Sequence, residues 1–328
     1  MFPVRDARET LDEALRCLLA QRDVDFEIVA VDDGSMDGSA EFLEAHAARD
    51  ARLRVFRAPA RGIVAALRDA CGRARGSVFA RMDADDTCPP DRLAKQLALL
   101  NARPDLGLVS CLVGPVQGAR FAGGYAHYVA WLNRLTEPEA IARNVWAECP
   151  LAHPTWMMRR EVYEQAGGYR ETGWPEDYDL MLRMHARGVR MAKVPEVLLR
   201  WRDTPTRLSR TDPRYSDDAF ARCTAHHLAR GPFANRREVA VIGAGRTTRK
   251  RAEHLTSEGL SIAAYVDVDP RKIGHRVHGR AVLAWDEIPS PVPWPLLAYV
   301  GSRGAREEIR AHAAERGFRE GLDFFVCW

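Results

Sequence analysis

The chain has 328 residues, which exceeds one average domain, so two domains are expected. Its composition, 46% hydrophobic and 28% charged, is that of a folded globular protein rather than a disordered chain. The formal net charge is only +3, and no run of Lys or Arg is long enough to form a tail that binds nucleic acid.

Cysteine usage and hydropathy indicate the compartment. The seven cysteines are scattered, odd in number and without CxxC spacing, which favours reduced thiols over a disulfide framework or a zinc site. No apolar run approaches the roughly 18 residues of a membrane span, and no signal peptide is visible. We therefore expect a cytoplasmic protein, and peripheral contact with the inner face of the membrane stays open.

The first quarter of the chain alternates between helical and strand patterns. A helical stripe over 9–21 precedes a buried strand over 26–31 and a helix that Asp37-Gly38-Ser39 caps. A short strand over 53–56 and a helix over 62–74 follow. Such alternation predicts a parallel, doubly wound α/β sheet.

A run of carboxylates follows the next expected strand, residues 75–82. Asp83, Asp85 and Asp86 come directly after it, at the strand end where an open α/β sheet places its ligands. Hard oxygen ligands this close together suit Mg²⁺ or Mn²⁺ held partly by the phosphates of a substrate. The alternative is an acidic strand-to-helix turn, with Asp86 near the start of a helix over 91–100.

The pattern is less regular beyond residue 104. The expected elements are a strand over 106–113 and helices over 137–144, 157–166 and 177–187. The segment from Gly231 to Arg237 has the composition of a linker, and a new βα pattern begins at Glu238. We therefore expect two domains, residues 1–232 and 233–328.

Six motifs occur in order within roughly the first two thirds of the chain. They are Leu18-Leu19-Ala20-Gln21, Val31 to Ser39, Arg81 to Asp86, His153-Pro154-Thr155, Gly167-Gly168-Tyr169-Arg170 and Glu176 to Leu180. Together they resemble family 2 glycosyltransferases of the GT-A fold. The combination is highly specific for that family and much less specific for the sugar.

The resemblance implies a metal-assisted donor site. Asp85 would ligate the metal, and Asp83 would contact the donor ribose or the metal. The metal would then act as a Lewis acid on the leaving nucleoside diphosphate.

The same resemblance places the nucleotide base near the start of the chain. Asp33 would read the base, Pro3 and Val4 would add backbone to that pocket, and Arg61 would reach the diphosphate. In one departure, the family opens with a full apolar strand, whereas only Met1-Phe2 precede Pro3. A central strand cut this short leaves backbone groups of its neighbours partly unpaired. We therefore expect that the true start lies upstream or that the chain has been trimmed.

The acceptor is an alcohol that must lose a proton as it attacks the anomeric carbon. One positioned carboxylate suffices for a single displacement with inversion. By resemblance Asp177 is that general base, with Glu176 supporting it; the alternative is that Asp177 caps a helix. His153 either contacts the metal or diphosphate or is a satisfied core residue. Four aromatic residues either stack on an acceptor sugar or belong to the core: Tyr125, Tyr128, Trp131 and Trp146.

The C-terminal part of the chain carries pieces of a dinucleotide fingerprint. A strand over 238–242 runs into Gly243 and Gly245, and a strand over 262–266 ends at Asp267. In that fingerprint the glycines allow close approach of phosphates and the acid binds ribose.

Two features depart from the full fingerprint. Thr248 replaces the third glycine, and the remaining chain is only a half-size Rossmann-like unit, completed by a strand over 296–300 and a turn over 301–304. The lobe is also similar to the nucleotide-sugar-binding lobe of some sugar acyltransferases. Three roles stay open: a structural or oligomerising module, a site for a nucleotide or sugar nucleotide, or a site for NAD(H).

The sequence therefore predicts an inverting glycosyltransferase that moves a sugar from a nucleotide donor to a glycan or lipid-linked hydroxyl. Uridine is the commonest base in the family, and synthesis of bacterial surface polysaccharide is the expected setting. A sugar-nucleotide pyrophosphorylase would need a Gly-rich basic loop that Pro3 to Thr10 lacks. A catalytically inert sugar-nucleotide-binding protein and an NAD-dependent oxidoreductase are the alternatives from other classes, and a homo-oligomer stays open.

Overall fold

The computed structural model describes residues 1–205, 207–289, 291–300 and 304–327, which form two compact units. The first comprises Met1–Ala142, Pro150–Glu171 and Arg183–Arg207, and the second comprises Arg143–Cys149, Thr172–Leu182 and Leu208–Trp328. The boundary expected at 232/233 stays a prediction, because the second unit draws on three parts of the chain. Of the expected turn over 301–304, residues 301–303 lie outside the described residues.

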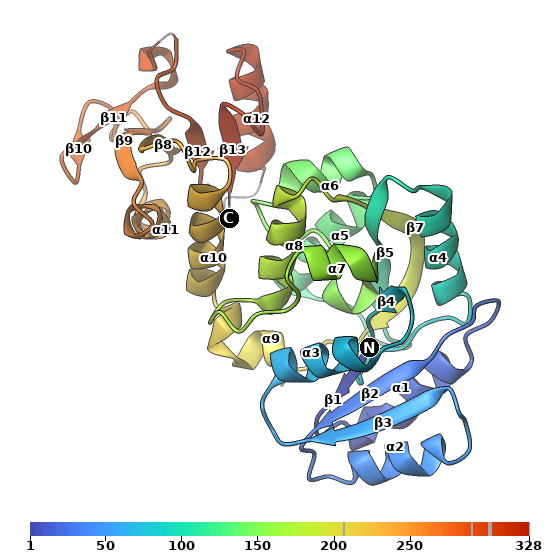
Figure 1. Cartoon of the computed structure of the whole chain (residues 1–328). Coiled ribbons are helices and arrows are strands. Elements are labelled where there is room, and N and C mark those ends of the chain that lie inside the picture. The colour runs from blue at the N-terminus through green and yellow to red at the C-terminus, as the bar shows by residue number, and fades with distance from the viewer. Residues whose placement is uncertain (206, 290, 301–303, 328) are drawn as a thin grey trace. The chain divides into compact units, whose positions relative to one another are not determined.

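Strands and helices alternate through the first part of the chain (Figure 1). The strands are β1 (Phe2–Val4), β2 (Ile28–Asp33), β3 (Leu53–Ala58), β4 (Val78–Ala80), β5 (Leu106–Pro115), β6 (Met157–Arg159) and β7 (Arg190–Trp201). The helices are α1 (Arg8–Leu19), α2 (Ser39–Ala47), α3 (Ile63–Arg73), α4 (Arg92–Ala102), α5 (Gly123–Arg134), α6 (Pro138–Asn144), α7 (Arg160–Gln165) and α8 (Glu176–Ala186), with a 3₁₀ helix η1 (His153–Thr155).

The first three strands form a parallel sheet with helices on both faces. Side chains alternate across a strand, so Ile28 and Ala30 of β2 face a core shared with α1 and α2. Val29 and Val31 point to the opposite face and pack against α3. Figure 1 shows α2 and α3 on opposite sides of these strands, which is the expected doubly wound arrangement.

The next four strands form a mixed sheet of order β4-β6-β5-β7. Strand β6 is antiparallel to both of its neighbours, whereas β5 and β7 are parallel. The helix expected over 157–166 is wrong for its first three residues, because Met157–Arg159 is a strand and α7 begins at Arg160. The buried Met157-Met158 pair satisfies its backbone between two strands, and its apolar character alone does not separate strand from helix.

Strand β1 joins the two sheets of the first unit. Its residues pair in parallel with Ala30–Asp32 of β2. On its other side, the Met82 N–H donates to the Met1 carbonyl at 3.2 Å, and the Met1 nitrogen donates to the Ala80 carbonyl at 2.7 Å. The short first strand therefore leads from β2 to the segment that ends in the acidic run.

The turn after β2 is held by its own polar residues. Asp32 Oδ2 accepts the Ser35 N–H at 3.1 Å, and Asp37 Oδ2 accepts the Arg8 N–H at 2.8 Å. Gly34 has φ +75°, and a Cβ there would lie 2.9 Å from a backbone nitrogen of Ala60, so only glycine suits this position.

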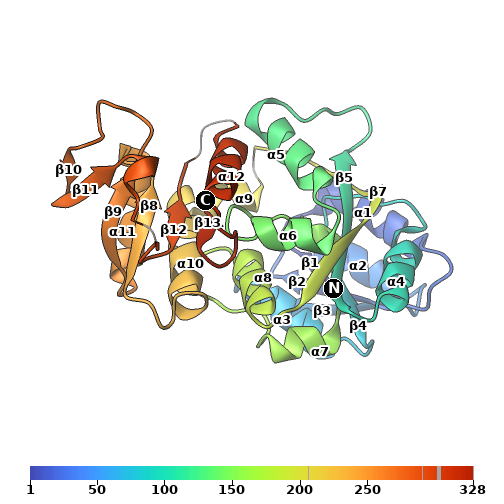
Figure 2. The same ribbon diagram turned by 90° about the horizontal axis from the view of Figure 1, so that it is seen from above.

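The second unit is built on a six-stranded sheet of order β10-β11-β9-β8-β12-β13, which Figure 2 shows side by side. All neighbouring pairs are parallel except β10 with β11. Its strands are β8 (Glu238–Ile242), β9 (Ser261–Val266), β10 (Arg276–Val277), β11 (Arg280–Leu283), β12 (Leu296–Ala298) and β13 (Phe324–Val326). The remaining helices are α9 (Leu208–Thr211), α10 (Asp217–Arg230), α11 (Arg246–Ser257) and α12 (Ala305–Glu315), with 3₁₀ helices η2 (Pro213–Tyr215) and η3 (Trp285–Glu287).

The first turns of α8 belong to this second unit and are tied to α10. The fully buried Tyr178 hydroxyl donates to the Val145 carbonyl at 2.7 Å and lies 3.3 Å from Thr224 Oγ1 on α10. These bonds satisfy a phenol that would otherwise be costly to bury.

None of the helices in the described part of the chain combines the length and apolar character needed to cross a membrane.

Candidate active site

The three carboxylates expected to bind a metal lie together after β4. One oxygen each of Asp83, Asp85 and Asp86 lies within 4.8 Å of the other two. Burial and the Asp83 carboxylate raise the pKa of Asp85 to about 6. Burial and the charges of Asp85 and Asp83 raise the pKa of the fully buried Asp86 well above its usual range. The cluster therefore concentrates negative charge that a bound cation would relieve.

One carboxylate oxygen of the cluster, Asp86 Oδ2, is buried without a hydrogen-bond partner among the described residues. The other oxygen accepts the Arg202 N–H at 3.0 Å, and Arg202 Nε donates to the Asp85 carbonyl at 2.9 Å. An orphaned carboxylate oxygen beside two further carboxylates is a donor set that suits a hard divalent cation. The residues therefore fit Mg²⁺ or Mn²⁺. Helix α4 is preceded by Asp91, so Asp86 does not cap it.

Two arginines supply positive charge beside the cluster. Arg81 Nη2 lies 2.6 Å from Asp83 Oδ1, and its side chain is only 5% exposed. Arg207 donates to the Tyr125 hydroxyl at 2.7 Å. Burial acts to lower the pKa of Arg207, but Tyr125 and Asp86 together raise it above its usual value. A guanidinium that stays charged among these carboxylates is suited to binding a diphosphate.

The loop that carries the cluster is anchored by α1 and by Gln21, two residues beyond the end of that helix. Thr10 Oγ1 donates to the Ala84 carbonyl at 2.9 Å. The buried Gln21 amide donates to the Pro89 carbonyl at 2.7 Å and accepts the Leu93 N–H at 2.9 Å. These bonds give a structural reason for glutamine at the end of the Leu18 to Gln21 motif.

Asp33, expected to read the base, already accepts hydrogen bonds from a neighbouring loop. Its two oxygens accept the N–H groups of Arg61 and Gly62 at 2.8 and 2.9 Å, and Arg5 lies 3.3 Å from Oδ2. The Arg61 guanidinium lies 3.3 Å from Asp69. Arg61 thus holds Asp33 through its backbone, while contact of its side chain with a diphosphate stays a prediction.

The backbone expected to complete the base pocket lies beside this residue. Pro3 and Val4 are buried in β1, in register with Val31 and Asp32 of β2. Both residues therefore lie at the end of β2 that carries Asp33.

The expected general base and its neighbour lie in the second unit, in the first turn of α8. Asp177 is half-buried, and its Oδ1 accepts the Tyr178 N–H at 2.7 Å. Glu176 is buried, and its two oxygens accept the Tyr215 hydroxyl at 2.9 and 2.7 Å. Glu176 therefore anchors the start of the helix. Asp177 is the more exposed of the two carboxylates, and its role as general base stays a prediction.

His153 is buried in η1 and lies 2.7 Å from the Tyr169 hydroxyl through Nε2. Burial and the charge of Arg81 lower the pKa of His153 well below its usual range, so the ring is neutral. Its ring packs edge-on against Trp156, with centroids 4.8 Å apart. These contacts are those of a satisfied core histidine, and contact with a metal or diphosphate stays a prediction.

Three of the four aromatic residues form a stripe along α5. Tyr125 and Tyr128 have ring centroids 6.1 Å apart, and Tyr128 and Trp131 have centroids 6.0 Å apart. All three are half-buried against the first unit's core. Trp146 is buried in the second unit. Because these three rings are only half-buried, their stacking on an acceptor sugar stays a prediction.

The glycine turn that follows β8 has a backbone conformation that favours glycine. Gly243 has φ +98°, and a Cβ there would lie 3.0 Å from Thr248 Oγ1. Thr248 Oγ1 donates to the Tyr299 carbonyl at 2.9 Å, so the residue that replaces the third glycine joins α11 to the end of β12. Gly245 directly precedes α11.

Asp267, expected to bind a ribose, is engaged by the protein itself. Its Oδ2 accepts the Ala244 N–H at 2.7 Å and lies 3.1 Å from Lys272 Nζ, while Oδ1 accepts the Asp269 N–H at 2.9 Å. Although burial opposes it, these hydrogen bonds lower the pKa of Asp267. The carboxylate therefore stays ionised while only 7% exposed.

Several residues near the acidic cluster were not expected from the sequence. The contact between Arg81 and Asp83 was predictable, because residues two apart in an extended segment face the same side. Arg207 and Tyr125 are 82 residues apart, and no sequence pattern connects them. Arg202 lies beyond the motifs that carry the resemblance.

Comparison with known proteins identifies the family of this chain. The family described as glycosyl transferase family 2 matches residues 1–167, about half of the chain. The chain belongs to this family. It is a glycosyltransferase.

Curated relatives of this glycosyltransferase cover 60–66% of the chain. An uncharacterized glycosyltransferase of Haemophilus influenzae is 30% identical over 197 residues, covering 60% of this chain and 71% of the relative. The putative glycosyltransferase EpsE of Bacillus subtilis is 30% identical over 225 residues, covering 66% and 76%. The amylovoran biosynthesis glycosyltransferase AmsE of Erwinia amylovora is 30% identical over 203 residues, covering 60% and 72%.

Solved structures share the fold at lower identity. TarS 1-349 of S. aureus in complex with UDP-GlcNAc has a TM-score of 0.58 and 18% identity, covering 77% of this chain and 70% of that one. A second structure of TarS 1-349 has a TM-score of 0.54 and 17% identity, covering 70% of this chain and 64% of that one. The chain thus spans slightly less than two thirds of the latter structure.

Proposed function

We propose that this glycosyltransferase moves a sugar from a nucleoside diphosphate sugar, with uridine as the expected base, to a hydroxyl of a glycan or lipid-linked acceptor. The proposed setting is polysaccharide synthesis, because relatives are named for amylovoran and O-antigen biosynthesis. The observation that carries the donor part is the cluster of Asp83, Asp85 and Asp86, in which one buried oxygen has no hydrogen-bond partner among the residues that the structure describes.

The residues of the first unit would bind and neutralise the donor diphosphate. Asp85 and Asp86 would hold a divalent cation, Mn²⁺ or Mg²⁺, which when bound stabilises charge on the leaving diphosphate. Asp83 would contact the donor ribose or the cation, and Arg207 would add a guanidinium for the phosphate oxygens. Asp33, with Pro3 and Val4, would form the wall for the base.

Asp177 would take the proton of the acceptor hydroxyl. A single carboxylate acting on the attacking alcohol gives one displacement and inversion at the anomeric carbon. Glu176, held by Tyr215, would fix the first turn of α8 so that the Asp177 carboxylate keeps its direction.

For the C-terminal sheet we propose a Rossmann-like supporting module rather than an NAD(H) site. The two Asp267 oxygens bind groups of the protein in place of a ribose. Thr248 occupies the third glycine position and joins α11 to β12.

Thermal unfolding with UDP, GDP and dTDP, each with and without Mn²⁺, tests the donor site. We expect one nucleotide to raise the melting temperature only with Mn²⁺, since a ligand at 100 times its Kd adds about 2.7 kcal/mol. The shift should vanish in Asp85→Ala and persist in Asp105→Ala, whose carboxylate is exposed and paired with Arg103. A metal-independent shift that survives Asp85→Ala would instead place binding in the C-terminal sheet.

A further inference from the structure

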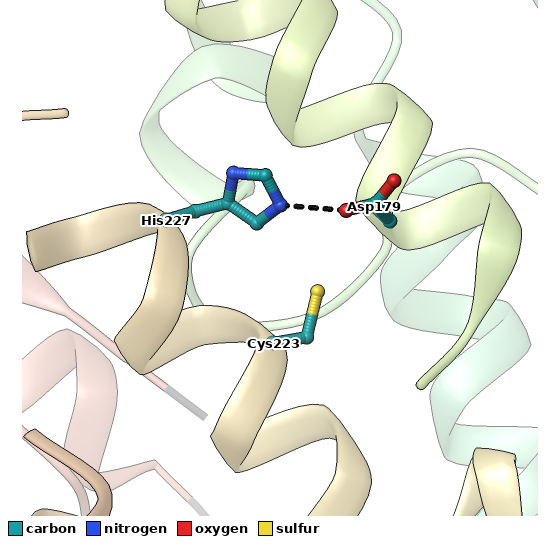
Figure 3. Close-up of side chains that lie close together, drawn as sticks. All are labelled: Asp179, Cys223 and His227. Atoms are coloured by element: carbon teal, nitrogen blue, oxygen red, sulfur yellow. Dashed lines mark hydrogen bonds and ion pairs between the residues drawn. The ribbon is translucent and has the colours of Figure 1, made fainter. Parts of the chain in front are cut away.

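A second group of metal-type ligands lies within the second unit, apart from the residues given roles above. Asp179 of α8 and Cys223 and His227 of α10 each offer one ligand atom, and these atoms lie within 4.8 Å of one another. Figure 3 shows the three side chains pointing toward one another from the two helices. Cys223 and Asp179 are buried, and the His227 side chain is 12% exposed.

The helical spacing brings two of the ligands to one face. Cys223 and His227 are four residues apart on α10, so their side chains lie one above the other. Asp179 approaches from α8, with its Oδ1 2.9 Å from His227 Nε2. In Figure 3 the Cys223 sulfur points toward the gap bridged by this hydrogen bond. The thiol of Cys223 and the carboxylate of Asp179 thus approach the same side of the His227 ring. In a catalytic triad, by contrast, the acid and the nucleophile bind the two different ring nitrogens. The arrangement therefore resembles a set of metal ligands more than a proton relay.

We propose that Asp179, Cys223 and His227 form a site for Zn²⁺ or a similar borderline-soft divalent cation. This proposal does not rest on the proposed function, and it departs from the sequence-based expectation that the cysteines take no part in a zinc site.

The donor types select the metal. Thiolate, imidazole and carboxylate are the ligands that zinc takes in proteins, whereas Mg²⁺ and Ca²⁺ prefer oxygen alone. On binding, Cys223 would release its thiol proton to solvent as its sulfur binds the metal. The proton of His227 Nε2 would exchange through solvent for one on Nδ1, so that a neutral imidazole binds the metal through Nε2. One thiolate and one carboxylate then balance the charge of the dication, so the buried site is neutral overall.

The distances need only a small adjustment. With metal–sulfur bonds of about 2.3 Å and metal–nitrogen or metal–oxygen bonds of about 2.0 Å, tetrahedral ligand atoms are separated by roughly 3.3–3.6 Å. The His227 and Asp179 atoms, which are 2.9 Å apart, would separate slightly, and the Cys223 sulfur lies within 4.8 Å of both. Three protein ligands leave a fourth position for water.

The surroundings already support the ligands. Trp174 Nε1 donates to Asp179 Oδ1 at 3.2 Å, which is the kind of outer hydrogen bond that orients a ligating carboxylate. Tyr178, next to Asp179, is held through its hydroxyl by Val145 and lies 3.3 Å from Thr224, next to Cys223. The two helices are therefore fixed to each other at the site. A bound metal would crosslink the turn of α8 that also carries Asp177.

Titration of metal-free protein with Co²⁺ tests the site, because a cobalt–thiolate bond gives a charge-transfer absorption band that carboxylate ligands do not. We expect one equivalent of Co²⁺ to produce this band and one equivalent of Zn²⁺ to abolish it, while excess Mg²⁺ leaves it unchanged. The acidic cluster, which has no sulfur, cannot give this signal.

Matched variants identify the ligands. Cys223→Ser should lose the band, whereas Cys149→Ser, which changes another buried cysteine of the same unit, should keep it. His227→Gln, at the more exposed edge, should weaken Zn²⁺ binding at least about tenfold. Trp174→Phe removes a hydrogen bond but no ligand and should retain the thiolate band.

Thermal unfolding gives an independent readout. Zn²⁺ should raise the melting temperature of wild type and Cys149→Ser but not of Cys223→Ser or His227→Gln. The proposal is overturned if wild type shows no thiolate band, or if the band and the Zn²⁺ shift survive in Cys223→Ser. In that case Trp174, Asp179 and His227 would form a hydrogen-bond network and not part of a metal site. Neither result bears on nucleotide binding with Mn²⁺, so failure here leaves the proposed function standing.

Discussion

The two clusters of metal-type ligands differ in chemistry and in how the chain assembles them. The acidic cluster uses three carboxylates within four consecutive positions after β4. The Cys–His–Asp cluster uses three different donors from α8 and α10, and Asp179 and His227 are 48 positions apart in the sequence. The first offers hard oxygens suited to Mg²⁺ or Mn²⁺, and the second offers a donor set suited to zinc.

The comparison shows which kind of site a sequence reveals. A local run at a strand end brings its carboxylates together wherever the strand goes, so the acidic cluster was predictable from Asp83, Asp85 and Asp86 alone. The second cluster forms only when α8 and α10 pack, because no spacing in the sequence relates Asp179 to Cys223. If the two sites are as different as their donors indicate, a substitution that abolishes metal binding at one site should leave metal binding at the other unchanged.

Loss of Asp85 should have the largest effect. Asp85→Ala is expected to lower kcat/KM for sugar transfer by about 1,000-fold or more, since metal stabilisation of a leaving group is worth several kcal/mol. The cobalt–thiolate band of the same protein should be unchanged. Steady-state kinetics with saturating Mn²⁺ and the Co²⁺ titration provide the two measurements. A variant that keeps most of its turnover would show that the acidic cluster is not the donor's metal site.

Asp177→Asn should come next. Removing a general base is expected to lower kcat about 100- to 10,000-fold, while the Mn²⁺-dependent melting shift with nucleotide persists. Because the amide is nearly isosteric, the cobalt–thiolate band should also persist despite the place of Asp177 on α8.

Glu176→Gln is the matched control for this experiment. The amide can still accept a hydrogen bond from Tyr215, so we expect kcat to fall far less than in Asp177→Asn. Equal turnover of Asp177→Asn and wild type would instead favour a protein that binds sugar nucleotides without transferring them.

The element pattern was predictable where amphipathic periodicity and turn residues agree. The turn from Asp32 to Ser39, the strand before Asp83 and the helix at Asp177 are all found in the structure. The strand β6 was mistaken for a helix, because the apolar pair Met157-Met158 suits either structure until its partners β4 and β5 are known.

The site was less predictable than the fold because several of its charges come from distant segments. Arg207 and Arg202 reach the acidic cluster from beyond β7. Only the folded chain shows that one oxygen of Asp86 has no hydrogen-bond partner within the described part of the chain. Asp267 shows that a motif alone does not reveal a residue's partners. Its position in the motif indicated a ribose contact, whereas its hydrogen bonds go to Ala244, Asp269 and Lys272.

A substitution at Arg92 tests how much this buried side chain stabilises the segment that carries the acidic cluster. This fully buried guanidinium donates to the carbonyls of Arg81 and Pro154, both at 2.6 Å. Arg92→Met would leave both carbonyls unsatisfied and should lower the free energy of unfolding by about 3 kcal/mol, as urea denaturation would measure. Arg103→Met, which removes an exposed arginine, should leave stability unchanged. An unchanged midpoint for Arg92→Met would show that the loop needs no such support.

The smallest expected effect is a pH dependence carried by His153 in the first unit. Its pKa is lowered by burial and by Arg81 in the folded protein, whereas in the unfolded chain it is near 6.5. Below pH 6.5 the unfolded chain therefore binds a proton that the folded protein does not, and stability falls as the pH falls. Between pH 6.5 and 5.5 this contribution is about 1 kcal/mol.

His153→Gln should remove that contribution while keeping a polar partner for Tyr169. Urea denaturation of both proteins at pH 5.5, 6.5 and 7.5 would measure it, and the two stability curves should converge toward low pH. Parallel curves would mean that the buried imidazole takes up its proton as readily in the folded state as in the unfolded chain. His153 would then have to be considered as a charged contact for a diphosphate, the role that its burial and its bond to Tyr169 argue against.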